Sequence, residues 1–588
     1  MAGTHGDRAA SLASHLRKFI RSSPVYAPVR RARLAALTRR PDVYPDWRAL
    51  MSGVEVSWRQ TLLMNHGPRI LIATHLGLHF AANTVDSLLA VALTWRSARV
   101  DIAFCDGVLP ACQMIDHGLA PSVERYAKSG PQPDFCTICH GAGKRVYEPL
   151  GLKTHDLSSF LSDEDRDQAA ARAALRAEGP LEPVAGDAAE EHAFSGALRF
   201  FGRASLADTK VVRRVLARYL TAADLADRAA RRLLAQEKYD IVIAHHGIYV
   251  PQGPTADAAR RAGARLVTWH ASYRRGRLIF EHGDTYHRAM IKEPASRWAA
   301  RPLSARQETA LDDYLASRAT GALDWITFQR DGPQPIEEIE NALGLRFDKP
   351  TTVLIGSVAW DALLHYPGSA YCNMIEWAIE TAKWFAARPN QQLIIRCHPG
   401  EVLSSPRATD RLDESVVNAL GRSPRNIVIA PPESALNTYA IAEACGRAII
   451  YNTKMGVELA ARGMPVIVAG DAWIRGKGFS FDAADRNEYF ALLAQTARLK
   501  PLNEHRRALA RRYAYHFFFR RCIPVDCINA EKGWPLCALV ESAGARARPG
   551  MDPGLDAICK AIFSGVPFEL DAAAPDDSRW STPDARYG

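Results

Sequence analysis

Short apolar runs alternate with longer amphipathic stretches in the C-terminal half of the chain. Five such runs, each ending in small or polar residues, span 351–357, 391–399, 426–432, 446–453 and 465–470. The intervals place apolar residues at helical spacing, as in 373–387. Strands that alternate with helices predict a doubly wound parallel sheet, which binds ligands at the carboxyl ends of its strands.

The N-terminal half repeats this pattern around a long interruption. Its apolar runs cover 69–74, 99–106, 239–247 and 264–272. Between the second and third runs, alanine-rich and aliphatic helical spacing predicts a helical insertion. The fold class expected is therefore α/β, with two Rossmann-like domains, a helical insertion in the first, and helical or disordered terminal segments.

The same pattern divides the chain into six segments. They are a basic helical arm (1–66), a first Rossmann-like domain (67–294) with a Cys-rich segment (105–139) and the insertion (157–237), a helical linker (295–350), a second Rossmann-like domain (351–500), C-terminal helices (501–545) and a tail (546–588). The tail is rich in Pro, Asp, Gly and Ala, a composition that predicts disorder.

The formal charge of +10 favours anionic partners, and its excess lies near the N-terminus. Residues 1–40 contain eight arginines and one lysine against one acid, with Leu12, Leu16, Phe19 and Ile20 at helical spacing. This arm is either an amphipathic helix on an anionic membrane surface or a solvated arm packed on the first domain. No recognition motif accompanies the charge, so nucleic acid is not expected as a partner.

No apolar run is long enough to cross a bilayer, and no apolar core leads to a secretory cleavage site. The expected location is cytoplasmic, or peripheral on the inner membrane face.

The segment 449–473 carries the strongest site pattern. A strand ends before Asn452 and Thr453, either of which can cap the next helix, and Lys454 adds a positive charge. Gly456 permits close approach of a ligand, and Glu458 lies one turn on, where it can accept hydrogen bonds from ribose hydroxyls. The segment predicts a phosphate site at a helix N-terminus; the alternative is an ordinary strand–helix–strand unit.

A second pattern ends the strand at 391–399. Arg396 and His398 emerge from this buried strand, a Pro-Gly turn follows, and Glu401 comes next. An imidazole at such a position can donate a hydrogen bond to a phosphate or a leaving group. The alternative is a structural histidine at a strand end.

In order and spacing, "RCHPGE", "PPESALNTYAIAEAC" and "YNTKMGVELAARGMPVIVAGDAWIRGKGFSFDA" resemble the bacterial capsule polysaccharide biosynthesis family over 351–482. Members of that family look like two-domain glycosyltransferases of the GT-B type and include Kdo transferases of capsule assembly. The resemblance implies that His398 contacts the donor phosphate. It also implies that Asn452 and Thr453 stand where the family has a Ser-Ser or Ser-Thr pair, and that Gly456 and Glu458 match a Gly-x-Glu motif.

The resemblance implies transfer of a sugar from a nucleotide-sugar donor to a surface polysaccharide or its lipid-linked acceptor. The altered Ser pair leaves a CMP-linked and a UDP-linked donor both open. Trp360 and Asp361, in the loop after the first strand of this domain, are expected to face the interdomain cleft. The alternatives are a sugar-nucleotide epimerase or hydrolase of the same fold, and a non-catalytic polysaccharide-assembly protein.

Histidines follow two predicted strands of the first domain, at His245-His246 and His270. An inverting transfer needs a base that takes the proton of the acceptor hydroxyl, and His246 or His270 is the expected base.

Four cysteines, Cys105, Cys112, Cys136 and Cys139, follow a C-x6-C…C-x2-C pattern. Two thiol pairs in a cytosolic protein are typical of a structural zinc site. The alternatives are an iron–sulfur cluster, free core thiols and redox chemistry.

Overall fold

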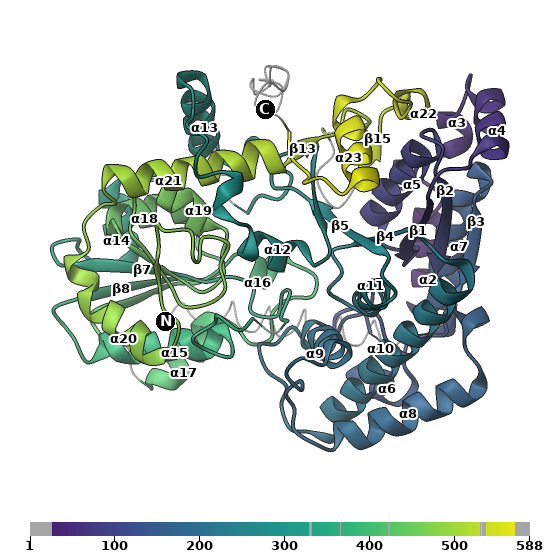
Figure 1. Cartoon of the computed structure of the whole chain (residues 1–588). Helices are drawn as coiled ribbons and strands as arrows, with labels where there is room; N and C mark the ends of the chain where they lie inside the picture. Colours follow the sequence, from purple (N-terminus) through teal and green to yellow (C-terminus); the bar gives the residue numbers. More distant parts are fainter. Residues whose placement is uncertain are drawn as a thin grey trace.

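The computed structural model describes residues 26–570, apart from 41, 121, 329–331, 365, 422–423, 530 and 532–536. Two sheet-centred domains lie side by side (Figure 1). The first contains a seven-stranded sheet in the order β13-β6-β5-β4-β1-β2-β3. Its strands are β1 (Arg69–His75), β2 (Arg99–Phe104), β3 (Lys153–Asp156), β4 (Ile241–His245), β5 (Arg265–Ala271), β6 (Arg277–His282) and β13 (Ile523–Pro524). Strands β1 to β5 are parallel, whereas β6 and β13 run antiparallel to their neighbours.

Helices cover the first sheet and fill the insertion. They include α5 (Phe80–Thr94), α7 (Pro133–Tyr147), α8 (Asp163–Ala177), α9 (Ala188–Phe201), α10 (Lys210–Glu237), α11 (Gln252–Arg261) and α12 (Tyr286–Lys292). The long helix α10 begins where the Thr209 hydroxyl accepts from the Val212 N–H. Its apolar residues recur every three or four positions and are buried against α8, α9 and α11.

The second domain has six parallel strands in the order β12-β11-β10-β7-β8-β9. They are β7 (Thr351–Ile355), β8 (Gln392–Arg396), β9 (Ile427–Ala430), β10 (Ala448–Ile450), β11 (Val466–Val468) and β12 (Phe481–Asp482). The helices between them include α15 (Met374–Ala386), α18 (Thr438–Cys445), α19 (Met455–Ala461) and α20 (Arg486–Gln495). Strand order reverses between β7 and β10, so the crevice at a topological switch point opens there.

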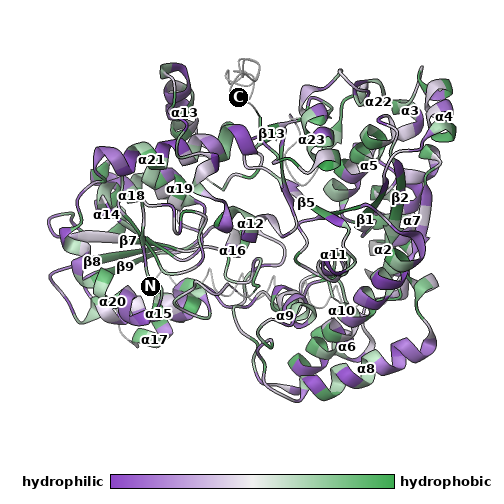
Figure 2. Ribbon diagram, in the orientation of Figure 1, coloured by the Kyte–Doolittle hydropathy of each residue, from purple (hydrophilic) through white to green (hydrophobic). Residues whose placement is uncertain are grey.

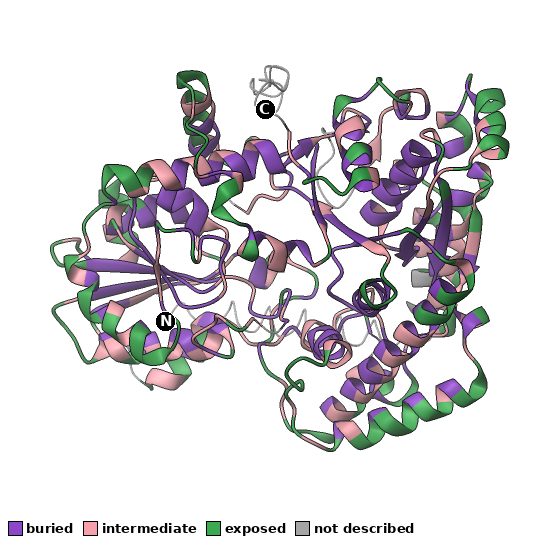
Figure 3. Ribbon diagram, in the orientation of Figure 1, coloured by how far each residue is buried: buried purple, intermediate pink, exposed green. Residues whose placement is uncertain are grey.

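The fold class expected from the sequence, α/β with two Rossmann-like domains and a helical insertion in the first, is confirmed. The central strands are hydrophobic (Figure 2) and buried (Figure 3), as the short apolar runs require. The linker carries α13 (Ala305–Ser317) and α14 (Ile336–Leu343).

The C-terminal segment connects the two domains again. Helix α21 (Glu504–Tyr515) packs on α19 and continues into a π-helical turn at His516–Arg521. The chain then enters the first domain, where β13 extends the sheet beside β6 (Figure 1).

The expected disorder from residue 546 onward is wrong for 546–570. Helix α23 (Pro553–Ser564) buries Leu555, Ile558 and Ile562, and its N-cap Asp552 accepts from the Leu555 N–H. This short apolar stripe packs against α5 and β13. Its burial orders the helix even though the surrounding residues are polar. Residues 571–588 and the expected amphipathic stretch from Leu12 to Ile20 lie outside the described residues.

Among the helices described, none is long and apolar enough to cross a membrane.

Candidate functional site

A pocket of about 120 Å³ lies at the carboxyl ends of β7, β8 and β10. This is the switch point of the second sheet, where doubly wound folds bind ligands. The pocket brings together His398 from the end of β8 with Thr453 and Lys454 from the start of α19. The linker adds Arg318 and Phe328, which lie 80 and 70 residues before His398 in the chain.

His398 presents a neutral N–H donor. The Gly400 N–H donates to its Nδ1 over 2.9 Å, so the ring hydrogen is on Nε2. Burial, aided by the nearby positive charges of Arg396 and Lys454, lowers the pKa of His398 to about 4. The Phe328 ring packs edge-on against the imidazole at 5.0 Å. At neutral pH His398 can therefore donate a hydrogen bond but carries no charge.

Arg396, expected to bind the ligand, lines the pocket and also holds a loop of the second domain. Its Nε donates to Thr438 Oγ1 over 3.1 Å, and its two terminal nitrogens donate to the carbonyls of Pro431 (2.8 Å) and Ser434 (3.2 Å). Although it lines the pocket, its main interactions fix the wall that carries Thr438.

Glu401 has a similar structural role. Its carboxylate accepts from the backbone N–H groups of His398 (3.2 Å) and Leu412 (2.9 Å). Burial raises the pKa of Glu401 to about 7. The expected ligand contact is replaced by a positioning role, because this carboxylate holds the turn that aims His398.

Glu458 lies at the centre of a buried charge cluster that we call the Glu458 cluster: Arg318, Tyr439, Lys454 and Glu458. The carboxylate accepts from the Tyr439 hydroxyl and from Lys454 Nζ, and Arg318 Nε lies 3.4 Å away. Its side chain is fully buried and is not part of the pocket wall, whereas its three partners are. The Glu458 carboxylate thus faces these three side chains, and it does not face the pocket as a contact to ribose hydroxyls would require. Glu458 is the counter-ion behind the cationic wall.

The electrostatics of this cluster follow from burial and from the charges it contains. Burial, with the like charge of Arg318, lowers the pKa of Lys454. For Glu458, burial alone acts to raise the pKa, but Arg318 and Lys454 outweigh it and lower the pKa. Lys454 Nζ also lies 4.3 Å from the centre of the Tyr273 ring, a cation–π contact that adds to its stabilisation.

The start of α19 differs in detail from the expectation. Thr453 Oγ1 accepts from the Met455 N–H over 3.4 Å, whereas the Asn452 amide oxygen accepts from Ser357 Oγ over 2.8 Å and does not cap the helix. A Cβ on Gly456 would lie 2.6 Å from Ile450 Cδ1. Gly456 therefore leaves room for the Ile450 side chain, and the close approach of a ligand at this position stays a prediction.

The loop after β7 contacts the first domain. The Tyr249 hydroxyl donates to Asp361 Oδ1 over 2.9 Å, and the Arg199 guanidinium lies 5.7 Å from the Trp360 ring. Trp360 and Asp361 therefore lie at the domain interface, facing the histidines of the first domain.

Histidines gather at the carboxyl ends of β1, β4 and β5. Ring centroids of His245 lie 4.7 Å from His79, 4.2 Å from His246 and 5.5 Å from His270. Burial lowers the pKa of each of these side chains. His79 was missed from the sequence, although it follows the first strand by four residues and so reaches the same edge of the sheet.

The two expected bases differ in tautomer. The His246 Nδ1 accepts from the Ile248 N–H over 3.2 Å, which leaves the hydrogen on Nε2. The His270 Nδ1 donates to the Ala271 carbonyl over 2.7 Å, which leaves the lone pair on Nε2. A general base needs a lone pair, so His270 fits that role and His246 fits a donor role.

A larger pocket of about 450 Å³ lies between the domains on the other side of β10. Glu191 and Phe194 of α9 form one side, and Tyr366, Asn452 and Asp471 of the second domain form the other. Asn452 thus faces this pocket, while the next residue, Thr453, lines the smaller one.

The zinc site expected at the four cysteines stays a prediction, because their sulfur atoms are not gathered at metal-binding spacing in the described residues. Among the described residues, no three of their sulfur atoms lie within 4.8 Å of one another. Burial raises the pKa of Cys136 and of Cys139 to about 12, so both are protonated thiols at neutral pH. Cys105 and Cys112 belong to the loop after β2, and Cys136 and Cys139 belong to α7. Cys105 and Cys139 are packed in the core, whereas Cys112 and Cys136 are only partly buried.

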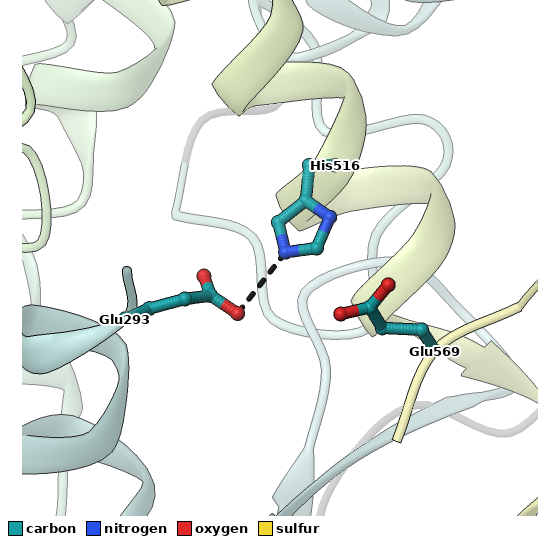
Figure 4. Close-up of side chains that lie close together, drawn as sticks. All are labelled: Glu293, His516 and Glu569. Carbon is teal, nitrogen blue, oxygen red and sulfur yellow. Dashed lines mark hydrogen bonds and ion pairs between the residues drawn. The ribbon is translucent and has the colours of Figure 1, made fainter. Parts of the chain in front are cut away.

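One group of side chains does have metal-like spacing: Glu293, His516 and Glu569 (Figure 4). His516 Nε2 lies 3.0 Å from Glu293 Oε1, and Arg297 lies 3.0 Å from the same oxygen and 2.5 Å from Glu569. Because arginine already neutralises both carboxylates, the group is an ion-pair network. It fastens the C-terminal segment to the end of the first domain.

No protein-family model matches the chain, and no curated protein matches it in sequence. Among solved structures, the chain is similar to KpsC, a β-Kdo 2,4 transferase of Thermosulfurimonas dismutans. The identity is 12% and the TM-score 0.32, over 53% of this chain and 88% of that one. It is also similar to α,α-trehalose 6-phosphate synthase of Burkholderia multivorans (12% identity, TM-score 0.32, 76% and 95% covered). A third is UDP-GlcNAc 2-epimerase of Neisseria meningitidis (10% identity, TM-score 0.24, 75% and 94% covered). With scores this low, the function has to be inferred from the residues of this chain.

Proposed function

We propose that this protein is a GT-B-type glycosyltransferase that takes its sugar from a nucleotide-sugar donor. One observation carries the proposal: His398 and Lys454 line a single pocket at the switch point of the second sheet. This pocket offers an uncharged N–H donor and two cations, the chemistry that binds a phosphate.

The donor extends beyond this pocket. Its volume of about 120 Å³ is below the roughly 300–1,000 Å³ of complete ligand sites, so it takes the phosphate end of the donor. The rest of the donor lies along the domain interface. Negative charge grows on the phosphate as the sugar leaves, and the His398 Nε2–H and Lys454 Nζ stabilise it there.

His270 is the proposed general base for an inverting transfer. Its tautomer leaves the lone pair on Nε2, which can take the proton from the acceptor hydroxyl as that oxygen bonds to the sugar carbon. We also propose that the acceptor is a capsule or other surface polysaccharide, or its lipid-linked precursor, and that the protein works at the inner membrane face. These two assignments rest on the family resemblance and the basic N-terminal arm.

Thermal-shift assays with nucleotides test the pocket. We expect CMP, UDP or one of their sugar conjugates to raise the Tm of the wild type, and His398→Ala and Lys454→Ala each to abolish that shift. His505→Ala and Lys383→Ala, which remove exposed residues of the same types, serve as matched controls and should keep it. An unchanged shift in both pocket variants would refute the assignment.

Product analysis separates the alternatives. The donor is incubated without any acceptor, and the sugar is followed by NMR. A transferase leaves most of the donor intact under these conditions, whereas an epimerase inverts a ring carbon and a hydrolase releases free sugar. If none of the donors is converted, either with or without an acceptor, the protein is the non-catalytic assembly protein.

A further inference from the structure

Arg199 is a cation at the domain interface that pairs with no carboxylate among the described residues. It lies near the end of α9, where its two terminal nitrogens donate to the carbonyls of Gln113 (2.6 Å) and Ser405 (3.3 Å). Its guanidinium lies 5.5 Å from the Tyr249 ring and 5.7 Å from the Trp360 ring. Within the described part of the chain, no carboxylate lies within ion-pair distance of it. A partly buried guanidinium held by carbonyl dipoles alone keeps an uncompensated positive charge.

Three further donors belong to the same region. The His79 Nδ1 accepts from the Ala82 N–H and the His246 Nδ1 from the Ile248 N–H, both over 3.2 Å, so each ring carries its hydrogen on Nε2. The indole N–H of Trp360 is buried and, among the described residues, has no acceptor. Buried donors of this kind are rare unless a water or a ligand completes them.

The rings link these donors into one group, which we call the Arg199 cluster: Arg199, His79, His246 and Trp360. His245 lies between His79 and His246, with ring distances of 4.7 Å and 4.2 Å. The His246 ring lies 5.3 Å from the Tyr249 ring on which Arg199 rests. Both nitrogens of His245 are buried and have no partner in the described residues.

A bound cation does not fit this group. The Nδ1 lone pairs of His79 and His246 are already occupied by backbone N–H groups, and an Arg side chain repels a metal ion. Within the residues described, these histidines also do not come within the spacing that a metal requires. The Arg199 cluster offers a formal charge and several N–H donors, the complement of an anionic group with several oxygens.

We infer that the Arg199 cluster binds an anionic group, a carboxylate or a phosphate, of the acceptor. This inference rests on the proposed function, since it takes the domain interface as the place of transfer. The loop that begins with Gly356 in the nucleotide pocket carries Trp360 four residues later. The acceptor's anionic group thus lies on the first-domain side of the interface, across this loop from the phosphate of the donor.

Isothermal titration calorimetry without nucleotide tests the cluster. The probes are glucuronate for a carboxylate, glucose 1-phosphate for a phosphate, and glucose as the uncharged control. We expect at least one acidic probe to bind and glucose not to bind, and the tighter acidic probe identifies the source of the charge. Arg199→Gln should weaken that binding by about tenfold or more, the effect of losing one charge-assisted hydrogen bond.

Two further variants separate binding from folding. Trp360→Phe keeps the ring but removes the unpartnered N–H, so it should weaken binding severalfold without lowering the Tm. Arg388→Gln is the matched control, because Arg388 stacks on Trp384 at 3.9 Å near the opposite end of the second sheet. Equal binding of glucose, or unchanged affinity in both Arg199→Gln and Trp360→Phe, would overturn the inference.

The inference and the proposed function fail in different ways. Arg199→Gln should keep the nucleotide-induced rise in Tm, because Arg199 is not part of the nucleotide pocket. An Arg199→Gln protein that loses acidic-sugar binding but keeps nucleotide binding supports both the inference and the proposed function. A wild type that binds acidic sugars but no nucleotide retains the anion site and refutes the proposed donor.

Discussion

Replacement of Glu458 by Gln tests how the cationic wall of the nucleotide pocket is held. The substitution keeps the shape of the side chain but leaves Arg318 and Lys454 next to each other without their shared counter-charge. Removing one partner of a buried ion pair costs about 3–5 kcal/mol. For a cooperative unit of 150–250 residues, this corresponds to a fall in Tm of roughly 6–20 °C.

The pH dependence has a definite sign. The pKa of Glu458 is lowered in the folded protein, so its stabilisation is present above the unfolded pKa and is lost as pH falls through the folded pKa. The difference in unfolding free energy between wild type and Glu458→Gln should therefore have its largest value at pH 7 and become smaller in strong acid. Glu458 also raises the pKa of Lys454, which burial lowers. The variant should therefore lose nucleotide binding at pH 8 and regain part of it as the pH falls and Lys454 becomes protonated.

Differential scanning calorimetry over pH 2–8 measures the first effect, and nucleotide thermal shifts over pH 6–8 measure the second. Glu443→Gln is the matched control, because Glu443 pairs with Arg462 on the surface with 56% of its side chain exposed. Such a pair contributes about 0–1 kcal/mol, so its Tm should hardly change. A Glu458→Gln protein as stable as this control, or one with undiminished nucleotide binding at pH 8, would refute the role of Glu458 as counter-ion.

Three other outcomes follow from the packing and the buried histidines. Gly456→Ala places a Cβ 2.6 Å from Ile450 Cδ1 and should cost about 1–3 kcal/mol in chemical denaturation; equal stability would contradict the packing role. Ile558→Ala, within the supposed tail, should cost about 2–5 kcal/mol, whereas Val566→Ala at an exposed site should cost little; similar losses would mean that α23 is not part of the core. Several histidines have a folded pKa far below the usual value because of burial: His75, His79, His287 and His398. As the pH falls, these histidines are protonated in the unfolded chain before they are protonated in the folded one. Each should therefore lower the free energy of unfolding by up to about 1.4 kcal/mol per pH unit below pH 6.5. A Tm that stays constant from pH 7 to 5 would contradict this.

The alternation of strands and helices was determined by the sequence alone. The runs at 351–357 and 391–399 are apolar because parallel strands are covered on both faces, and β7 and β8 lie within them. Their carboxyl ends share one edge of the sheet, so His398 and Lys454 were expected to be close, and they line one pocket. Local period and turn chemistry are enough for this step because they depend on neighbouring residues.

The role of each side chain was decided by tertiary structure. Arg396 and Glu401 have the residue types of a binding site, yet their partners are the backbone of other loops. Glu458 became a counter-ion because the linker brings Arg318 to it from 140 positions away. No local pattern encodes such a pairing.

The same reason explains the cysteines, the tail and Arg199. The spacing of the cysteines predicted a metal site, whereas packing buries Cys105 and Cys139 and leaves Cys112 and Cys136 partly exposed. Composition predicted disorder after 546, but α23 docks on the first sheet. Arg199 lies in a helical insertion with no motif around it, and only the tertiary structure places it beside Trp360 of the second domain. The sequence determined the strands, helices and sheet edges of this protein, because these follow from the order of apolar and polar residues. The pairing of the charged side chains depends on contacts between segments that are distant in the chain, so only the tertiary structure decided it.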